Sequence, residues 1–330
     1  MGFKYFFSGS AMFIGIDIGG TGIKGVLADK GGVIFATGRT PTPKTAKEIN
    51  QSIDKLARHL AQDADVPFSK IKGIGIGSAG SIDSDKGKVI TSPNIPAWRN
   101  YPLAKEVEKL TGKKTFIEND ATVAVLGELW MGRGSKYKNW FMLTLGTGIG
   151  GGAIVEGQLL RGRNGVAAEF GHIPIDHKEK PCGCGSTGCF EQYASATALI
   201  ALANELTAKY PSSKVTEYAK SRPLNAKVVC DEYKNGDALA KEAVDTVAYY
   251  LGVGIAALAN VFNPEAVIIG GGISRDLPLF LPGIRKEIDR RAVKGIREKI
   301  AICAVKHEDK GPALGAIRNA IDRLEAKEKK

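Results

Sequence analysis

The spacing of apolar side chains predicts alternating helices and strands in the first half of the chain. Residues 49–60 repeat isoleucine and leucine at helical spacing, and residues 71–77 alternate isoleucine with glycine or lysine, as a strand does. Residues 115–118 form a second predicted strand, which runs into a helix with Val123 on its apolar face. Strands and helices thus follow one another, as they do in α/β proteins.

The second half of the chain continues the same alternation. A long helix rich in alanine and valine is predicted over residues 238–260, and it ends at the Asn-Pro pair 263–264. The apolar run 266–269 that follows predicts a buried strand, and the last helix is predicted to begin at the Gly-Pro pair 311–312. The expected fold class is α/β, with mixed sheets in two domains.

A repeated segment supports the division into two domains. Residues 16–29 and 143–156 each show an apolar strand, a Gly/Thr turn, a second apolar strand and an acidic end, which is the pattern of a β-hairpin. The separation of the two copies is too long for a solenoid repeat. We therefore expect a smaller N-terminal domain over residues 1–118, completed by a C-terminal helix at 311–330, and a larger domain over residues 119–310.

The composition excludes some classes of protein. Of 330 residues, 43% are hydrophobic and 25% are charged, so a disordered chain is excluded, and no uninterrupted apolar run of about 18 residues predicts a membrane span. The net charge of +11 is spread along the chain and indicates attraction to anionic small substrates rather than to nucleic acid. The apolar start of the chain has no separate cleavage site, so we expect a cytoplasmic protein with no membrane or nucleic-acid partner.

Glycine-rich turns follow three of the predicted strands. Residues 19–22, 146–148 and 270–272 place backbone N–H groups, and in the first two turns a threonine hydroxyl, where phosphate oxygens can approach. The spacing matches neither a P-loop nor a Rossmann turn. Asp17 lies inside the first strand just before its turn. Its carboxylate is either a turn cap or the group that orients Mg²⁺ beside nucleotide phosphates.

A polar tripeptide, Glu118-Asn119-Asp120, lies where a predicted strand meets a helix. Asp120 is either the N-cap of that helix or a base for a sugar hydroxyl, with Asn119 beside it as donor and acceptor. The carboxyl ends of strands in α/β domains are where ligands bind, which favours the second interpretation.

One cluster has the residue types of a metal site. His172, Cys182, Cys184 and Cys189 provide one imidazole and three thiols within a glycine-rich loop at residues 172–191, a set suited to tetrahedral zinc. An odd number of clustered cysteines argues against disulfides. Four protein ligands leave zinc no open position, so the metal is expected to organise the loop. Glu169 and Glu191 bracket the loop, either as surface carboxylates or as groups that the folded loop brings together.

These motifs, in this order, resemble those of the ROK family (repressors, open reading frames and kinases) of the actin-like, hexokinase-related superfamily. The resemblance spans most of the chain. It is carried by 17–21 (DIGGT) with Lys24, 78–80 (SAG), 92–98 (SPNIPAW), 118–121 (ENDA), 145–152 (LGTGIGGG), 169–172 (EFGH), 182–191 (CGCGSTGCFE), 263–264 (NP) and 268–272 (IIGGG).

The resemblance implies a two-domain, actin-like (ribonuclease H-like) fold and a sugar kinase that uses ATP, Mg²⁺ and a structural Zn²⁺. Asp120 is then the catalytic base for the sugar 6-hydroxyl. The residues implied to bind the sugar are Gly80, Asn94, Asn119, Asp120, Glu169, His172 and Glu191. Those implied to bind the nucleotide and Mg²⁺ are Asp17, Gly19, Gly20, Thr21, Lys24, Gly146, Thr147, Gly148, Gly271 and Gly272.

The branch of the family and the partners follow from smaller signals. Residues 159–165 together with the cysteine cluster resemble the glucokinase branch, whereas kinases of N-acetylhexosamines, mannose or fructose use overlapping residues. Repressors of the family carry a helix-turn-helix domain before the first phosphate motif, which disfavours a sugar-responsive regulator here. ATP or polyphosphate remain alternative donors, and a homo-oligomer, dimer or tetramer, is expected from the resemblance.

Overall fold

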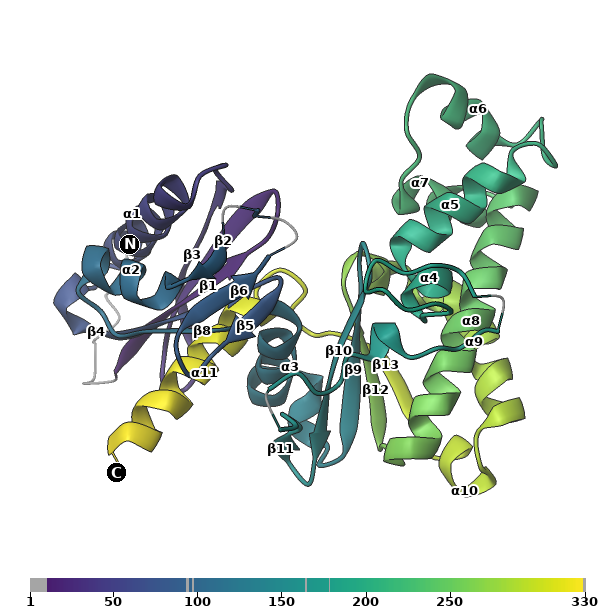
Figure 1. The fold of residues 1–330 in the computed structure, drawn as a ribbon. Helices are drawn as coiled ribbons and strands as arrows, with labels where there is room; N and C mark the ends of the chain where they lie inside the picture. The colour runs from purple at the N-terminus through teal and green to yellow at the C-terminus, as the bar shows by residue number, and fades with distance from the viewer. Residues whose placement is uncertain (1–10, 93–94, 97, 164, 178, 329–330) are drawn as a thin grey trace, which may run out of the picture. The chain divides into compact units, whose positions relative to one another are not determined.

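The structure is a computed structural model, and it describes residues 11–92, 95–96, 98–163, 165–177 and 179–328. The chain forms two compact units (Figure 1). The first comprises Met1–Ser135 and Lys306–Lys330, and the second comprises Lys136–Val305. The division thus falls at residues 135 and 305, whereas the sequence placed it at 118 and 310.

The first unit is built on a mixed five-stranded sheet in the order β3-β2-β1-β4-β8. Strand β1 pairs antiparallel with β2, which pairs antiparallel with β3, and β1 pairs parallel with β4, which pairs parallel with β8. The strands are β1 (Met12–Ile18), β2 (Gly22–Asp29), β3 (Ile34–Pro41), β4 (Ile71–Ser78) and β8 (Thr115–Asn119).

Helices cover this sheet, and a small second sheet follows β4. The helices are α1 (Ala46–Asp63), α2 (Leu103–Thr111), α3 (Asp120–Met131) and α11 (Gly311–Glu328), with short 3-10 turns η1 (Phe68–Lys70) and η2 (Arg133–Lys136). The small antiparallel sheet consists of β5 (Ser81–Asp83), β6 (Lys88–Thr91) and β7 (Arg99–Tyr101).

The second unit has a mixed sheet in the order β11-β10-β9-β12-β13. Its strands are β9 (Trp140–Leu145), β10 (Ile149–Val155), β11 (Gln158–Leu159), β12 (Ala266–Gly270) and β13 (Ala301–Ala304). When the strands of each sheet are numbered in chain order, both sheets read 3-2-1-4-5. The shared order agrees with the repeated hairpin in the sequence, because that hairpin forms the first two strands of each sheet.

The helices of the second unit are more numerous. They are α4 (Glu191–Ala194), α5 (Ala196–Leu206), α6 (Lys214–Ser221), α7 (Ala226–Lys234), α8 (Ala238–Phe262), α9 (Leu277–Arg291) and α10 (Lys294–Arg297), with 3-10 turns η3 (Phe170–His172) and η4 (Gly272–Asp276). The described residues therefore form an α/β fold with mixed sheets, as the sequence predicts.

Helix α8 is the most apolar element of the second unit. Among the described residues, it is the helix long and apolar enough to cross a membrane by length and composition. Its apolar face, however, is buried in the core of this unit, where Val244, Val247, Leu251 and Ile255 are fully buried. This burial identifies α8 as a core helix, which lies beside α9 in Figure 1.

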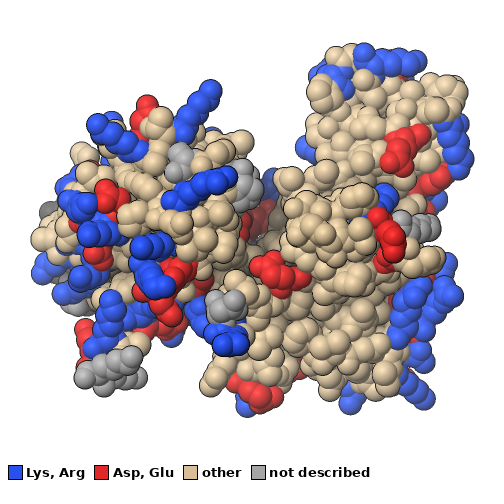
Figure 2. All heavy atoms as spheres, viewed as in Figure 1, with Lys and Arg blue, Asp and Glu red and all other residues tan. Residues whose placement is uncertain are grey.

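Charged side chains are distributed over the surface. On the face drawn in Figure 2, Lys and Arg side chains are scattered over both units with acidic side chains among them. This face therefore agrees with the diffuse distribution that the sequence indicates for its net charge of +11.

The C-terminal helix α11 contacts the first sheet and α3 at backbone distance. A Cβ atom added to Gly75 of β4 would lie 1.8 Å from the carbonyl oxygen of Ala316, and one added to Gly315 would lie 1.7 Å from that of Val123. Glycine alone allows such an approach. Because α3 packs on α11 in this way, α3 belongs to the first unit. The boundary between the units therefore follows α3, after Ser135, and not residue 118.

Replacing Gly75 by alanine is expected to destabilise the first unit by about 3 kcal/mol or more, because the new methyl group would meet backbone that cannot rotate away. Thermal or denaturant unfolding measures this. Gly295→Ala is the control, since nothing lies within 4 Å of a Cβ added there. Equal melting of the two variants would contradict backbone contact between β4 and α11.

Candidate active site

The carboxyl ends of three strands meet at one edge of the first sheet. Ile18 of β1 pairs with Ser78 of β4, and Ser78 pairs with Asn119 of β8. The turn after β1, the turn after β4 and the start of α3 therefore lie next to one another. This register brings together predicted site residues from distant parts of the chain: Asp17, Gly19, Gly20, Thr21, Gly80, Asn119 and Asp120.

Asp17 and Lys24 face each other across the β1–β2 hairpin, where they are register partners. The turn between the strands is closed by a 3.0 Å hydrogen bond from Gly19 N to Gly22 O, and Gly20 and Thr21 are exposed. The Lys24 ammonium donates to Asp309 at 2.9 Å. Asp309, in the loop before α11, was not singled out from the sequence, because nothing local connects it with Lys24.

The start of α3 shows which residue caps this helix. Asn119 is the N-cap: its Oδ1 accepts from the N–H groups of Ala121 and Thr122 at 2.9 and 3.2 Å. Asp120 is therefore the first helical residue and not the cap, which leaves most of its carboxylate for another partner. The Asn119 amide also donates to Gly80 O at 3.2 Å, so it has one further N–H to offer a ligand.

The two aspartates at this edge share an unfavourable electrostatic environment. Burial raises the pKa of Asp17 to about 6, repulsion from Asp120 adds to the rise, and Lys24 opposes it. Burial also raises the pKa of Asp120, against hydrogen bonds from the backbone N–H of Ala121 and others. A divalent cation would relieve this repulsion, and carboxylates are ligands that Mg²⁺ prefers.

In the second unit, two glycine-rich turns also lie at one sheet edge. Gly146 N donates to Gly148 O at 3.0 Å in the β9–β10 turn, and Gly270 of β12 pairs with Thr144 of β9. Gly271 follows with a positive φ of 84°, and a Cβ on it would lie 2.3 Å from Leu145 O. The predicted nucleotide residues Gly146, Thr147, Gly148, Gly271 and Gly272 are thus brought together in this unit.

A pocket of about 390 Å³ adjoins this pair of turns. It lies between α7 and η4, with Cys230 and Lys234 on one side and Gly272 and Ile273 on the other. Burial raises the pKa of the Cys230 thiol to about 12. Cys230 and Ile273 are almost fully buried, and most of the other lining residues are charged: Lys227, Asp231, Lys234, Arg275 and Asp276.

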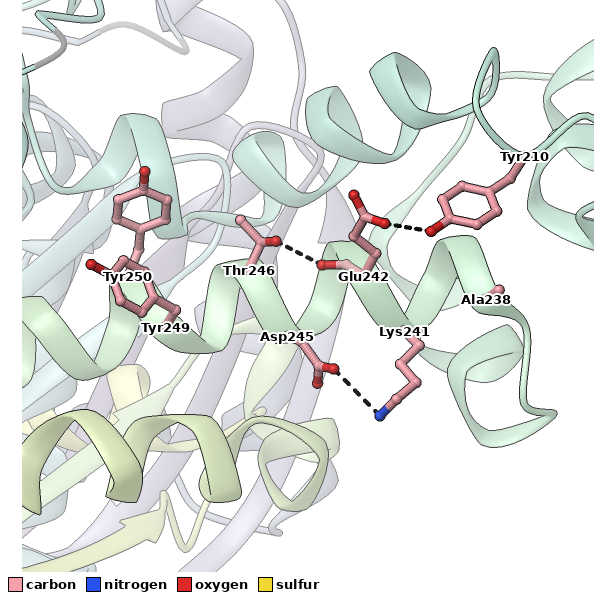
Figure 3. A pocket seen from close by; sticks show the side chains of 8 residues that line it. All are labelled: Tyr210, Ala238, Lys241, Glu242, Asp245, Thr246, Tyr249 and Tyr250. Atoms are coloured by element: carbon pink, nitrogen blue, oxygen red, sulfur yellow. Dashed lines mark hydrogen bonds and ion pairs between the residues drawn. The ribbon is translucent and has the colours of Figure 1, made fainter.

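A groove of about 650 Å³, larger than this pocket, lies along α8 (Figure 3). Its lining includes Tyr210, Glu242, Tyr249 and Tyr250, and Tyr210 donates a hydrogen bond to Glu242. None of the predicted site residues lines it. Its size alone therefore does not make it the site of chemistry.

The four predicted metal ligands come together in the second unit. Cys182 Sγ lies 3.7 Å from His172 Nδ1, Cys184 Sγ lies 3.7 Å from Cys189 Sγ, and all four ligand atoms lie within 4.8 Å of one another. Zn–S bonds of about 2.3 Å in a tetrahedron place sulfur atoms about 3.8 Å apart. The cluster therefore fits zinc, and Nδ1 of His172 is the nitrogen that faces the thiols.

The loop that carries these ligands brings Glu191 to His172. Glu191 Oε1 lies 3.8 Å from His172 Nδ1 and accepts from Cys182 Sγ at 3.2 Å, while Oε2 accepts from the backbone N–H of Ile149 at 3.3 Å. Glu169 is exposed, next to η3, and its carbonyl accepts from His172 N at 3.0 Å. Asn94, the remaining predicted sugar ligand, lies outside the described residues.

Asp17→Asn is expected to raise stability at pH 8 by about 2 to 3 kcal/mol, because a pKa near 6 means that the folded state pays to ionise this group. The cost is absent below pH 3.8, where the carboxyl is protonated in both states, and it is complete above about pH 6. Melting curves at pH 5 and pH 8 measure the difference. Asp245→Asn, which removes the same charge from an exposed position paired with a lysine, should show no such pH dependence.

Cys184→Ser is expected to lose the metal, which elemental analysis should find at one zinc per chain in the unaltered protein. Cys303→Ser, outside the cluster, should keep it. A full zinc content in Cys184→Ser would show that Cys184 is not a ligand.

Comparison with known proteins agrees with this arrangement. Residues 13–323 match the ROK family. A glucokinase from Thermotoga maritima is 40% identical over 83% of this chain and 86% of its own length. A xylose repressor from Caldicellulosiruptor bescii is 32% identical over 94% of this chain and 78% of its own length.

A solved structure extends the similarity to the fold. The ROK family glucokinase from Streptomyces griseus, in complex with glucose and AMPPNP, has a TM-score of 0.80 and 35% identity. The match covers 94% of this chain and 99% of that protein. The two-unit α/β architecture is therefore the actin-like fold of such proteins.

Proposed function

The chain belongs to the ROK family, and from this premise we propose that it is a glucokinase, which transfers the terminal phosphoryl group of ATP to the 6-hydroxyl of glucose. The observation that carries the proposal is the placement of Asp17 and Asp120 at one sheet edge, beside a glycine-rich turn in which Gly20 and Thr21 are exposed. Phosphoryl transfer requires a base near the attacking hydroxyl and a charge-stabilising site for phosphates.

Asp120 is the group that takes the proton from the attacking hydroxyl. Its carboxylate is not used as an N-cap, and burial, by raising its pKa, makes it a better proton acceptor than an exposed aspartate. Asn119 positions it, because its Oδ1 holds the first N–H groups of α3. The developing alkoxide then attacks the terminal phosphorus, and ADP leaves.

Asp17 orients Mg²⁺, and the turns at Gly19, Thr21 and Gly146–Gly148 hold the nucleotide phosphates through their N–H groups. Magnesium, when bound, supplies positive charge against that of the transferred phosphoryl group. Lys24, fixed by Asp309, adds a cation beside Asp17. The pocket at Gly272 takes the adenosine, with Gly271 allowing its close approach.

The sugar ligands on the second unit are Glu169, His172 and Glu191. Because Nδ1 of His172 faces the zinc cluster, its Nε2 remains to donate to a sugar hydroxyl. A zinc ion held by His172, Cys182, Cys184 and Cys189 would be structural, because it would fix the loop in which Glu191 Oε1 lies 3.8 Å from His172 Nδ1. On the first unit, Asn119 offers one N–H, and Gly80 is held by it.

Two alternatives differ in substrate or in class. Mannose, fructose and the N-acetylhexosamines also carry a 6-hydroxyl but differ from glucose at other ring positions, and pocket shape decides among them by about 1 to 3 kcal/mol. A sugar-responsive regulator is the non-enzymatic alternative, since xylose repressors match the chain, but a regulator needs neither Asp17 nor Asp120. Release of ADP from Mg-ATP across a panel of these sugars distinguishes the three.

We also propose that the protein is cytoplasmic and that it forms a homo-oligomer. The cysteines of the cluster are unpaired thiols, which suits the reducing cytoplasm where ATP is made. The homo-oligomer, dimer or tetramer, expected from the resemblance stays a prediction that light scattering tests.

Asp120→Asn is expected to lower kcat by about three orders of magnitude or more with little change in glucose binding, because the amide cannot accept the proton but keeps the side-chain shape. Steady-state ADP release and calorimetric titration with glucose measure the two effects. Asp63→Asn serves as the control and should keep full activity. Retained turnover in Asp120→Asn would assign the base to another group.

A further inference from the structure

The chain crosses between the two units twice. It leaves the first unit after Ser135, within η2, and it returns between Val305 and Lys306. At the second crossing, consecutive N–H groups have partners in different units: Val305 N donates to Ile269 O of β12 at 2.9 Å, whereas Lys306 N donates to Glu128 of α3 at 3.0 Å. The change from one unit to the other is therefore confined to one peptide.

Glu128 holds both crossings on the side of the first unit. Its side chain is 2% exposed. Oε2 accepts from the backbone N–H of Arg133 at 2.8 Å, and Oε1 accepts from those of Lys306 at 3.0 Å and His307 at 3.5 Å. One carboxylate thus ties two segments that are more than 170 residues apart.

The neighbouring backbone is shaped around this carboxylate. A Cβ added to Gly132 would lie 2.2 Å from Glu128 Oε2, so only glycine fits at that position. The Lys306 side chain makes a second tie, from Nζ to Met131 O at 3.2 Å. The end of α3 and the return of the chain are therefore joined at two points.

Glu265 plays the corresponding part in the second unit. It precedes β12, and its Oε2 accepts from the backbone N–H groups of Lys138 and Asn139 at 2.7 and 2.8 Å. Glu128 thus holds the backbone at residue 133, and Glu265 holds it at residues 138 and 139. The intervening residues 134–137 include most of the 3-10 turn η2. Short 3-10 turns commonly serve as connectors between elements, and this one joins two segments that are each anchored by a carboxylate.

We propose that Glu128 and Glu265 fix the two ends of a hinge formed by residues 134–137 and the 305–306 peptide, and that Glu128 is a positioning residue for the kinase reaction. The second half of this statement rests on the proposed function. Glu128 touches no substrate. It limits the arrangements that the two crossings can adopt, so the arrangement competent to bind both substrates is more populated.

The chemistry of the contact explains why a carboxylate is needed. Its two oxygens are acceptors only, and each one serves a different crossing. In Glu128→Gln, the amide NH₂ group must face the N–H of Arg133 or those of Lys306 and His307. Two N–H donors then face each other, so the hydrogen bonds to one of the two crossings are lost, while the volume of the side chain is unchanged.

Glu128→Gln in the full-length, zinc-loaded protein is the first test. Amide hydrogen exchange should accelerate by about tenfold or more in peptides containing Arg133 or Lys306 and His307. The KM for glucose should rise about tenfold, with a smaller change in kcat.

Glu287→Gln is the matched control. Glu287 is 3% exposed and pairs with Arg291 in α9, away from both crossings, so the change removes the same charge from an equally buried site. It should leave exchange at the crossings and the KM unchanged. An effect of Glu128→Gln no different from that of Glu287→Gln would overturn the proposal.

A second pair of variants keeps the test decisive if Glu128→Gln does not fold. Lys306→Pro removes the N–H that Glu128 accepts together with the side chain that binds Met131 O, whereas Lys306→Ala removes the side chain alone. The proline variant should raise the KM well above that of the alanine variant, and equal values would contradict the hinge. If the unaltered protein phosphorylates no sugar, the proposed function fails, and the exchange data still decide the hinge.

Discussion

The parallel pairing of β1, β4 and β8 is the interaction on which the rest of the site depends. It aligns Ile18, Ser78 and Asn119 at one edge, and so it sets Asp17, Gly80 and Asp120 side by side. Helix α11, seated on Gly75 at backbone distance, keeps these strands from shifting. A one-residue slip would turn Asp17 to the opposite face of the sheet. Fold and site are thus fixed by the same contacts.

The least favourable electrostatics that we identify lie at the sheet edge that carries Asp17 and Asp120. Asp17 is held with a pKa near 6 because it is buried beside Asp120. When it is ionised, such a buried carboxylate lowers the stability of the fold without a bound cation, but it provides a ligand for one. The second unit follows a different principle. The sugar ligands proposed for that unit lie on a loop without long strands, and a zinc ion held by the Cys₃His set would supply the rigidity that the loop lacks.

How much the sequence predicted depended on whether the signal was local. The hairpins, the helix at residues 238–260 and the Cys₃His set were predicted from short-range spacing, and the structure contains each of them. Asp309, Glu128 and Glu265 were missed. Each acts on backbone or side chains from distant segments, and an isolated acidic residue in a helix or loop looks like surface charge.

The sequence by itself determined the alternation of elements, the duplicated hairpin and the Cys₃His set, because periodicity and short spacings are properties of neighbouring residues. Only the tertiary structure decided that Asn119 rather than Asp120 caps α3, and that α3 belongs with α11 in the first unit. The cap depends on which side chain reaches the free N–H groups. The division depends on glycines in α3, α11 and β4 that meet other backbones, a contact that no local pattern encodes.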